Sequence, residues 1–224
     1  EMVKAVKPKL KKLPRLTDIV IIDNLENFKR TVLRLDRAAV CEEGVAVDYE
    51  KRKIVVCYGR GGRNFLSKLF SAQARIFFKD FMAELPLWLH EGLVAFFREV
   101  AVGGAMDQAP LRIIGYNPAS IESVQQLIKK GKLPGIAEIR SERERDCFTV
   151  EHKLSAWAFV YWSQYSGKGS RLALKSYIAE LKETGNDNIE KHLRMPLSEF
   201  EKRWREWLLR REVYSGGAIK NMRK

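Results

Sequence analysis

The chain has 224 residues, 46% of them hydrophobic and 31% charged, which excludes an intrinsically disordered protein and suffices for one domain with a substantial core. Its 41 Lys and Arg against 28 Asp and Glu give a net charge of +13, which favours anionic partners such as nucleic acid, acidic lipid headgroups or acidic proteins. Three cysteines are too few for a disulfide framework, and no apolar run approaches the ~20 residues of a membrane span.

The basic residues are densest before the first predicted strand. The six that cluster there are Lys4, Lys7, Lys9, Lys11, Lys12 and Arg15. This pattern has two interpretations, a solvated tail and an arm that docks on an anionic surface or nucleic acid. We expect a basic arm over residues 1–16, a single domain over 17–212 and a basic tail over 213–224. Because the sequence begins at Glu1 rather than Met, we also expect a fragment or a processed form.

The first 60 residues are predicted to form a small sheet and one helix. The β-branched run at residues 17–22 predicts a buried strand, and Asp23 or Asn24 is suited to cap a helix that extends to about Arg37. Residues 38–59 are typical of a hairpin with its turn at 49–52. In such a hairpin Cys41 and Cys57 either pair or stay free, and both alternatives are open.

The rest of the chain is predicted to be helical. After a break at Gly59, Gly61 and Gly62, the apolar spacing predicts the helices 64–80, 86–100 (with Pro86 in its first turn), 119–130, 149–165, 168–183 and 197–212. Residues 103–110 are expected to be a loop. Ser198 and Glu201 have the spacing of a capping box. The fold class is therefore α+β, a small amino-terminal sheet followed by a mostly helical half.

The most informative stretch is LPLWLHEGLVAFF, residues 85–97. It resembles the second zinc-site helix of the peptidase-MA-like (gluzincin) metallopeptidases, in which the Glu of this motif is the third zinc ligand. Residues 44–56, 121–139, 148–165 and 193–208 resemble further segments of the same family. The resemblance implies a zincin-like fold over about residues 17–210, with the helices 64–80 and 86–100 side by side, and it places Glu91 at the ligand position.

The first zinc helix of that family is where this sequence departs from it. A working member carries H-E-x-x-H there, two His one turn apart with a Glu as general base. The helix 64–80 contains no His, and the resemblance aligns Ala72 and Ile76 with the two ligands and Gln73 with the base. One carboxylate cannot hold zinc tightly or acidify its water. We therefore expect a degenerate zinc site with no metal and no cofactor, in which Glu91 is a vestigial ligand.

A charge near Glu91 is then needed, because a buried carboxylate is costly without a partner. Arg75 lies in the same turn of the helix as Gln73, and we expect an Arg75–Glu91 pair. His90 and His152 are the other candidates to line the old cleft, although His152 also suits a helix start. His90 opens a second incomplete H-E-x-x-H, in which Val94 replaces the second His. An active enzyme with Glu91, His90 and His152 as relocated ligands is a third alternative.

These observations favour a non-catalytic relative of the metallopeptidases that binds a protein or peptide, or acts as a scaffold. Peptides in such enzymes add to an edge strand, and residues 53–58 or the first strand are the candidates for that edge. The alternative is a basic module that binds nucleic acid, ribonucleoprotein or an acidic membrane surface. The family resemblance favours a location outside the cytoplasm, but the sequence carries no signal, so the compartment stays open.

Overall fold

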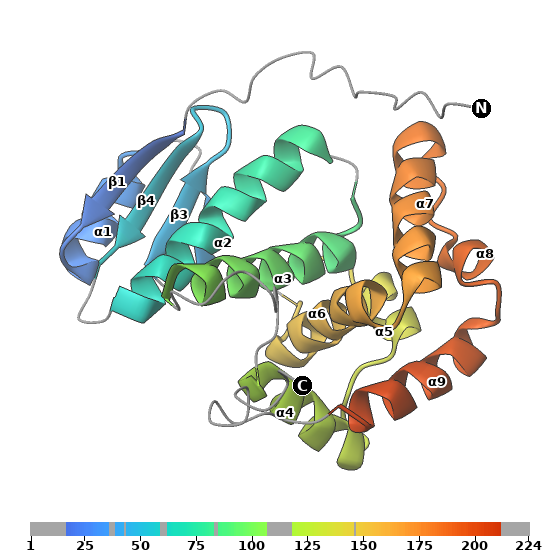
Figure 1. The fold of residues 1–224 in the computed structure, drawn as a ribbon. Coiled ribbons are helices and arrows are strands. Elements are labelled where there is room, and N and C mark those ends of the chain that lie inside the picture. Colours follow the sequence, from blue (N-terminus) through green and yellow to red (C-terminus); the bar gives the residue numbers. More distant parts are fainter. Residues whose placement is uncertain are drawn as a thin grey trace, which may run out of the picture.

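The computed structural model describes residues 17–35, 39–42, 44–58, 62–82, 85–106, 118–145 and 147–211. Its elements, in chain order, are β1 (Asp18–Ile22), α1 (Leu25–Leu33), β2 (Ala39–Glu42), β3 (Val45–Asp48), β4 (Lys53–Cys57), α2 (Gly62–Phe81), α3 (Leu87–Met106), α4 (Pro118–Lys129), α5 (Ile136–Ser141), α6 (Val150–Tyr165), α7 (Lys168–Thr184), α8 (Ile189–Leu193) and α9 (Leu197–Leu209). The fold is α+β, with a small sheet at one side and helices at the other (Figure 1). The basic arm 1–16 and the tail 213–224 lie outside the described residues.

The sheet has four strands in the order β1-β4-β3-β2. β1 pairs with β4 in parallel, whereas β3 is antiparallel to both β4 and β2. The predicted hairpin over 38–59 is therefore wrong in one respect, since its first arm is divided into β2 and β3, with Gly44 at a φ of +76° between them. The segment 53–58 is also wrong as an edge, because β4 lies between two other strands. The edges are β1 and β2.

Alternation along the strands gives the sheet two apolar faces. Ala46, Val55 and Cys57 point to the face that α1 covers, where Phe28 is the buried residue of that helix. The opposite face carries Val45, Val47, Ile54 and Val56, which pack with residues of α2. Each face thus has its own helix, and α2 lies against β3 and β4 on its side of the sheet (Figure 1).

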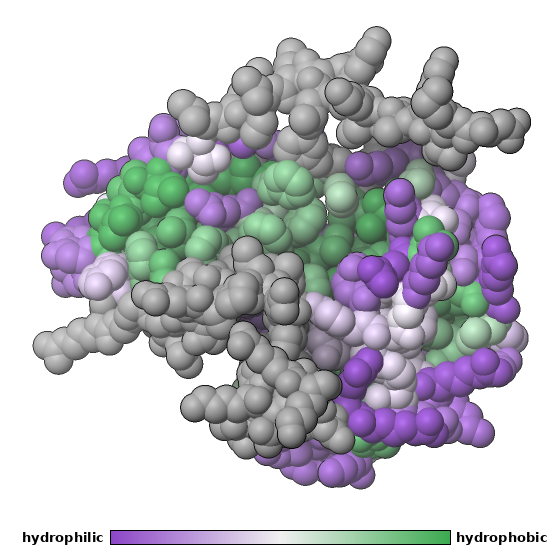
Figure 2. Space-filling view, viewed as in Figure 1, coloured by the Kyte–Doolittle hydropathy of each residue, from purple (hydrophilic) through white to green (hydrophobic). Residues whose placement is uncertain are grey.

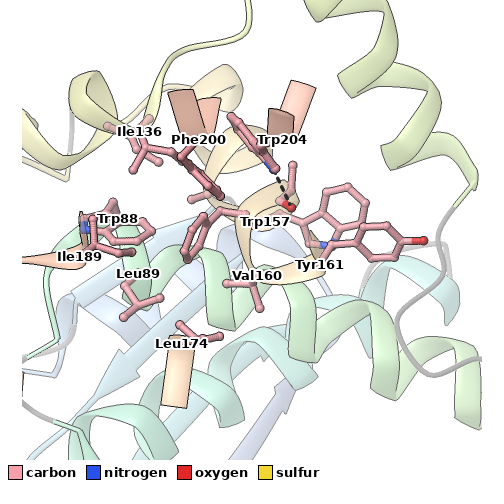
Figure 3. Close-up of a cluster of buried hydrophobic side chains, with 14 of the residues drawn as sticks. Trp88, Leu89, Ile136, Trp157, Val160, Tyr161, Leu174, Ile189, Phe200 and Trp204 are labelled. Carbon is pink, nitrogen blue, oxygen red and sulfur yellow. Dashed lines mark hydrogen bonds between the residues drawn. The ribbon is translucent and has the colours of Figure 1, made fainter. Parts of the chain in front are cut away.

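The helical half has a larger, aromatic core built around α6. Its biggest fully buried side chains include Trp88, Trp157 and Trp204. Figure 3 shows these rings converging from α3, α6 and α9, with the Trp204 indole N–H donating to the Ala158 carbonyl at 3.4 Å. The Trp88 ring packs edge-on against Phe159 at 5.2 Å between centroids. These three tryptophans therefore pack in the core and are not on the surface, where they could stack on the bases of a nucleic acid.

Several predicted helix boundaries are confirmed. Asn24 is the cap of α1, with its side-chain oxygen accepting from the Asn27 N–H at 2.9 Å. Gly131 and Gly185, with φ of +65° and +68°, follow the ends of α4 and α7, as glycine does where a helix must stop in a left-handed turn.

Other boundaries differ from the prediction. α1 ends at Leu33 rather than near Arg37, and α3 continues through residues 103–106, which were expected to begin a loop. Pro86 precedes α3 instead of lying in its first turn, and its carbonyl accepts from the His90 N–H. α9 ends at Leu209. The short helices α5 and α8 were not predicted, because five or six residues are too few to show a periodicity.

The capping box predicted at Ser198 and Glu201 is wrong. Pro196 stands at the start of α9 with no side-chain cap. Glu201 instead accepts hydrogen bonds from the backbone N–H groups of Ile136 and Ala137, at 2.5 and 3.3 Å. It therefore caps a different helix, α5, and ties α9 to it, a long-range contact that local spacing does not reveal.

The described residues also include two of the cysteines and the helices that were considered as membrane spans. Cys57 is a buried free thiol and Cys147 an exposed one, so of the two alternatives left open for Cys57 the structure has the free thiol. β2, which carries Cys41, is separated from β4 by β3. In the part of the chain that the structure describes, no helix combines the length and apolar character needed to cross a bilayer.

Candidate functional site

The candidate site lies where α2 and α3 pack side by side, as the sequence predicted. α3 is held on its other side by the helical core, since Trp88 and Leu89 in its first turn are fully buried there. Gly92 allows α3 to approach α6 closely, because a Cβ at this position would lie 2.6 Å from the Ala156 carbonyl oxygen. These contacts fix the turn of α3 that carries Glu91 and point its carboxylate at α2.

Glu91 and Arg75 form a buried, two-point ion pair. The Arg75 Nη2 donates to Glu91 Oε2 at 2.7 Å, and Nη1 donates to Oε1. The side chains are only 7% and 3% exposed. Paired, parallel N–H···O bonds are the strongest arrangement available to a guanidinium and a carboxylate. The Arg75–Glu91 pair expected from the sequence is therefore confirmed.

Two further groups surround the same carboxylate. Arg145, from the loop between α5 and α6, places its Nη1 3.1 Å from Glu91 Oε1, and His90 Nδ1 lies 3.5 Å from that oxygen. Burial acts to raise the pKa of Glu91, but hydrogen bonding from His90 and Arg75 and the charges of Arg75 and Arg145 outweigh it and hold this pKa well below its ordinary value. Glu91 is thus an ionised carboxylate beside two guanidinium groups, those of Arg75 and Arg145, and the His90 imidazole.

This arrangement does not fit a zinc ion. A catalytic zinc takes three protein ligands and an open position. Here both oxygens of Glu91 accept from Arg75, and the guanidinium occupies the side from which a cation would approach. A second positive charge, on Arg145, adds electrostatic repulsion. Among the described residues, no three His, Cys, Asp or Glu side chains are grouped so that they could share a metal ion.

The side chains of Ala72 and Ile76, which the resemblance aligns with the family's two His ligands, do not point toward Glu91. Both side chains pack with Val47, Ile54 and other residues of the sheet. The face of α2 that meets α3 carries Arg75 and, one turn earlier, the buried Ser71. Gln73, which the resemblance aligns with the general base, is half-buried and belongs to neither of these two sets of residues. By helical spacing, the i, i+4 pair on the face of α2 toward α3 is Ser71 and Arg75, one residue before the aligned pair, and Arg75 contacts Glu91.

The remaining His candidates are separated by the fold. His152 belongs to the start of α6, where its ring Nδ1 accepts from the Thr149 backbone N–H at 3.1 Å and its backbone N–H donates to the Thr149 hydroxyl at 3.3 Å. Its Nε2 lies 3.6 Å from Glu138. The helix-start interpretation of His152 is confirmed, and the relocated ligand set with Glu91 and His90 is not assembled. Val94, at the second position of the alternative H-E-x-x-H, packs against Ala74 and Phe78.

Arg145 is the residue of this site that sequence reasoning missed. It lies in the run SERERD, where charges alternate and nothing distinguishes one Arg from its neighbours. Only the tertiary fold brings that loop over the first turns of α3. A buried carboxylate calls for cationic partners, which suggests that an Arg lies nearby. The sequence does not indicate which Arg it is.

Comparison with known proteins gives no relative: no family model, no curated protein and no solved structure matches this chain.

Proposed function

We propose that this protein is a non-catalytic, metallopeptidase-like domain that binds a protein or peptide or serves as a scaffold. The observation that carries the proposal is the two-point pairing of Glu91 with Arg75, at the position where the family resemblance puts a zinc ligand. An Arg in place of a His supplies the charge that the metal would have supplied. In this proposal the ion pair keeps α2 and α3 together and leaves no site for an activated water.

The proposal predicts that zinc affinity can be created on the register of the structure. We expect Ser71→His/Arg75→His/Arg145→Ser to bind one equivalent of zinc, because two imidazoles one turn apart would face Glu91 with the opposing charges removed. Isothermal titration with zinc, with circular dichroism as the check on folding, measures the affinity. The matched control is Ala72→His/Ile76→His/Arg145→Ser, whose imidazoles would face the sheet and which is expected to bind no zinc.

A folded Ser71→His/Arg75→His/Arg145→Ser variant without zinc affinity would show that Glu91 does not occupy a ligand position. Tighter binding by the control would restore the register of the sequence alignment instead. The first result removes the basis for treating the domain as a former zinc peptidase, and the second removes the register assigned to α2 here.

A further inference from the structure

A pocket of about 480 Å³ opens between the helices α6, α7, α8 and α9. Its volume lies in the range of about 300 to 1,000 Å³ that is common for small-molecule sites. Figure 1 shows α7 and α8 at the end of the molecule away from the sheet. None of the described residues that line the pocket belongs to α2, α3 or the loop of Arg145, so it is separate from the site of Glu91.

Part of the wall of this pocket is aromatic and apolar. The Trp162 ring stands edge-on to Phe200, with 4.8 Å between the ring centroids, and both residues line the pocket. Phe200 is 1% exposed and belongs to the helical core, so packing fixes this part of the wall. Leu172 of α7 also lines the pocket but is 51% exposed. Figure 2 shows apolar surface between hydrophilic side chains in this part of the molecule. An apolar ligand that covered Leu172 would therefore remove apolar surface from water.

The charged part of the lining is entirely basic. Lys191, His192 and Arg194 line the pocket, whereas no Asp or Glu is among its described lining residues. Glu180 of α7 already holds the first two, since its Oε2 accepts from Lys191 Nζ at 2.8 Å and lies 2.9 Å from His192 Nε2. Its Oε1 accepts from the side chain of Asn186 at 2.8 Å. Arg194 has no acidic partner within the described ranges of the chain, so an anion in the pocket would meet an unbalanced positive charge.

The backbone of Arg194 has a conformation that favours glycine. Arg194 follows the end of α8 with a φ of +57°, in the left-handed region. Gly131 and Gly185 have the same role after α4 and α7, with φ of +65° and +68°. Residues other than glycine that are held in this region are enriched where ligands bind. Because glycine would end α8 equally well, what Arg194 adds at this position is its guanidinium group.

We propose that this pocket binds a small amphipathic carboxylate, a free monocarboxylate with an apolar chain or ring. The apolar body of the ligand packs against Trp162 and Leu172, and its carboxylate pairs with Arg194. A ligand with a positive charge is disfavoured, because every charged residue of the described lining is basic. This binding site adds a small-molecule ligand to the proposed role in protein or peptide binding, and it does not depend on that role.

Isothermal titration of the full chain with octanoate and with 4-phenylbutyrate tests the proposal. The matched controls are the alcohols and the ammonium ions that carry the same apolar bodies. We expect at least one carboxylate to bind about tenfold or more tightly than its alcohol, because it gains a charge-assisted pair with Arg194. The preferred carboxylate then shows whether the apolar body is a chain or a ring. Binding should change the tryptophan fluorescence, and Trp162→Phe, which keeps an aromatic ring in the wall, should remove this change.

Arg194→Gly separates the loss of binding from a loss of folding. Glycine adopts a φ of +57° without steric cost, so the thermal unfolding midpoint, followed by circular dichroism, should stay the same or rise. Binding of the carboxylate should nevertheless weaken about tenfold. Arg203→Gln is the matched control, because it removes the charge of an exposed Arg on α9 that does not line the pocket, and it should leave binding unchanged.

Leu172→Glu should also weaken binding, because it places a like charge beside the carboxylate at a side chain that is already half exposed. Leu209→Glu makes the same change at a Leu of α9 that is 40% exposed and outside the lining, and it should have no effect. The inference would be overturned if the folded chain bound neither carboxylate, or bound the alcohols or ammonium ions equally well. Binding that both Arg194→Gly and Leu172→Glu left intact would overturn it too.

Discussion

Replacing Gly92 with alanine is expected to destabilise the protein by about 3 kcal/mol or more, because it forces overpacking between two helices. The added Cβ would lie 2.6 Å from the Ala156 carbonyl oxygen and 2.8 Å from its carbonyl carbon. Both atoms are backbone, so no side-chain rotation relieves the contact, and α3 must move away from α6. Urea unfolding followed by tryptophan fluorescence measures the loss, since Trp88 and Trp157 lie in the adjoining core.

The matched control is Gly169→Ala in α7. Nothing lies within 4 Å of the added Cβ there, and alanine restricts the unfolded chain and favours a helix. We expect Gly169→Ala to be neutral or to stabilise the protein by up to about 1 kcal/mol. If Gly92→Ala behaved like this control, the close approach of α3 to α6 that positions Glu91 would be incorrect.

Replacing Arg75 with methionine is expected to cost about 3 to 5 kcal/mol, the usual effect of removing one partner of a buried ion pair. Glu91, 3% exposed, would keep its charge with only Arg145 and His90 beside it. Arg75→Met/Glu91→Met should recover most of the loss, because two apolar side chains of similar length replace the pair. Equilibrium unfolding of the single and double variants measures both effects. Equal losses in both would mean that packing, rather than the uncompensated charge, sets the cost.

The cost of Arg75→Met should also shrink as the pH falls from about 7 to about 4. In the wild type the pKa of Glu91 is held below its ordinary value, so the pair stabilises the fold above the unfolded-state pKa and loses this contribution as the pH falls toward the folded value. In the variant, burial is opposed by fewer charges and raises the pKa of Glu91, so mild acid neutralises the buried charge. Arg203→Met, which breaks an exposed pair with Glu199, should show little effect at any pH.

The sequence predicted the fold class and most helices because their apolar spacing or capping residues are local. Asn24, Gly131 and Gly185 act within a few residues of where they stand. The division of the hairpin at Gly44 was missed, although Glu42, Glu43 and Gly44 interrupt the apolar residues there, because the β-rich segments on both sides were taken as one arm. The order of the strands was also beyond local patterns, because β1 joins β4 across two intervening strands.

The candidate site was also predictable only where a local pattern of residues pointed to it. The resemblance singled out Glu91, and the need to balance a buried carboxylate pointed to Arg75, with which it pairs. The register of α2 was not recoverable, because this helix buries one face against the sheet and another against α3, which spreads its apolar residues around most of the helix. From the sequence alone, Ala72 and Ser71 therefore suit the sheet-facing side and the α3-facing side of α2 equally well.

Zinc content of the purified wild-type chain tests the central claim, that Glu91 is neutralised by Arg75 and holds no metal. The protein is equilibrated with an equimolar amount of zinc, freed of unbound metal by gel filtration and analysed for zinc per chain, beside Glu91→Gln. The expected result is far less than one equivalent in both proteins, because the two carboxylate oxygens already accept from Arg75. One equivalent in the wild type that is lost in Glu91→Gln would contradict the account.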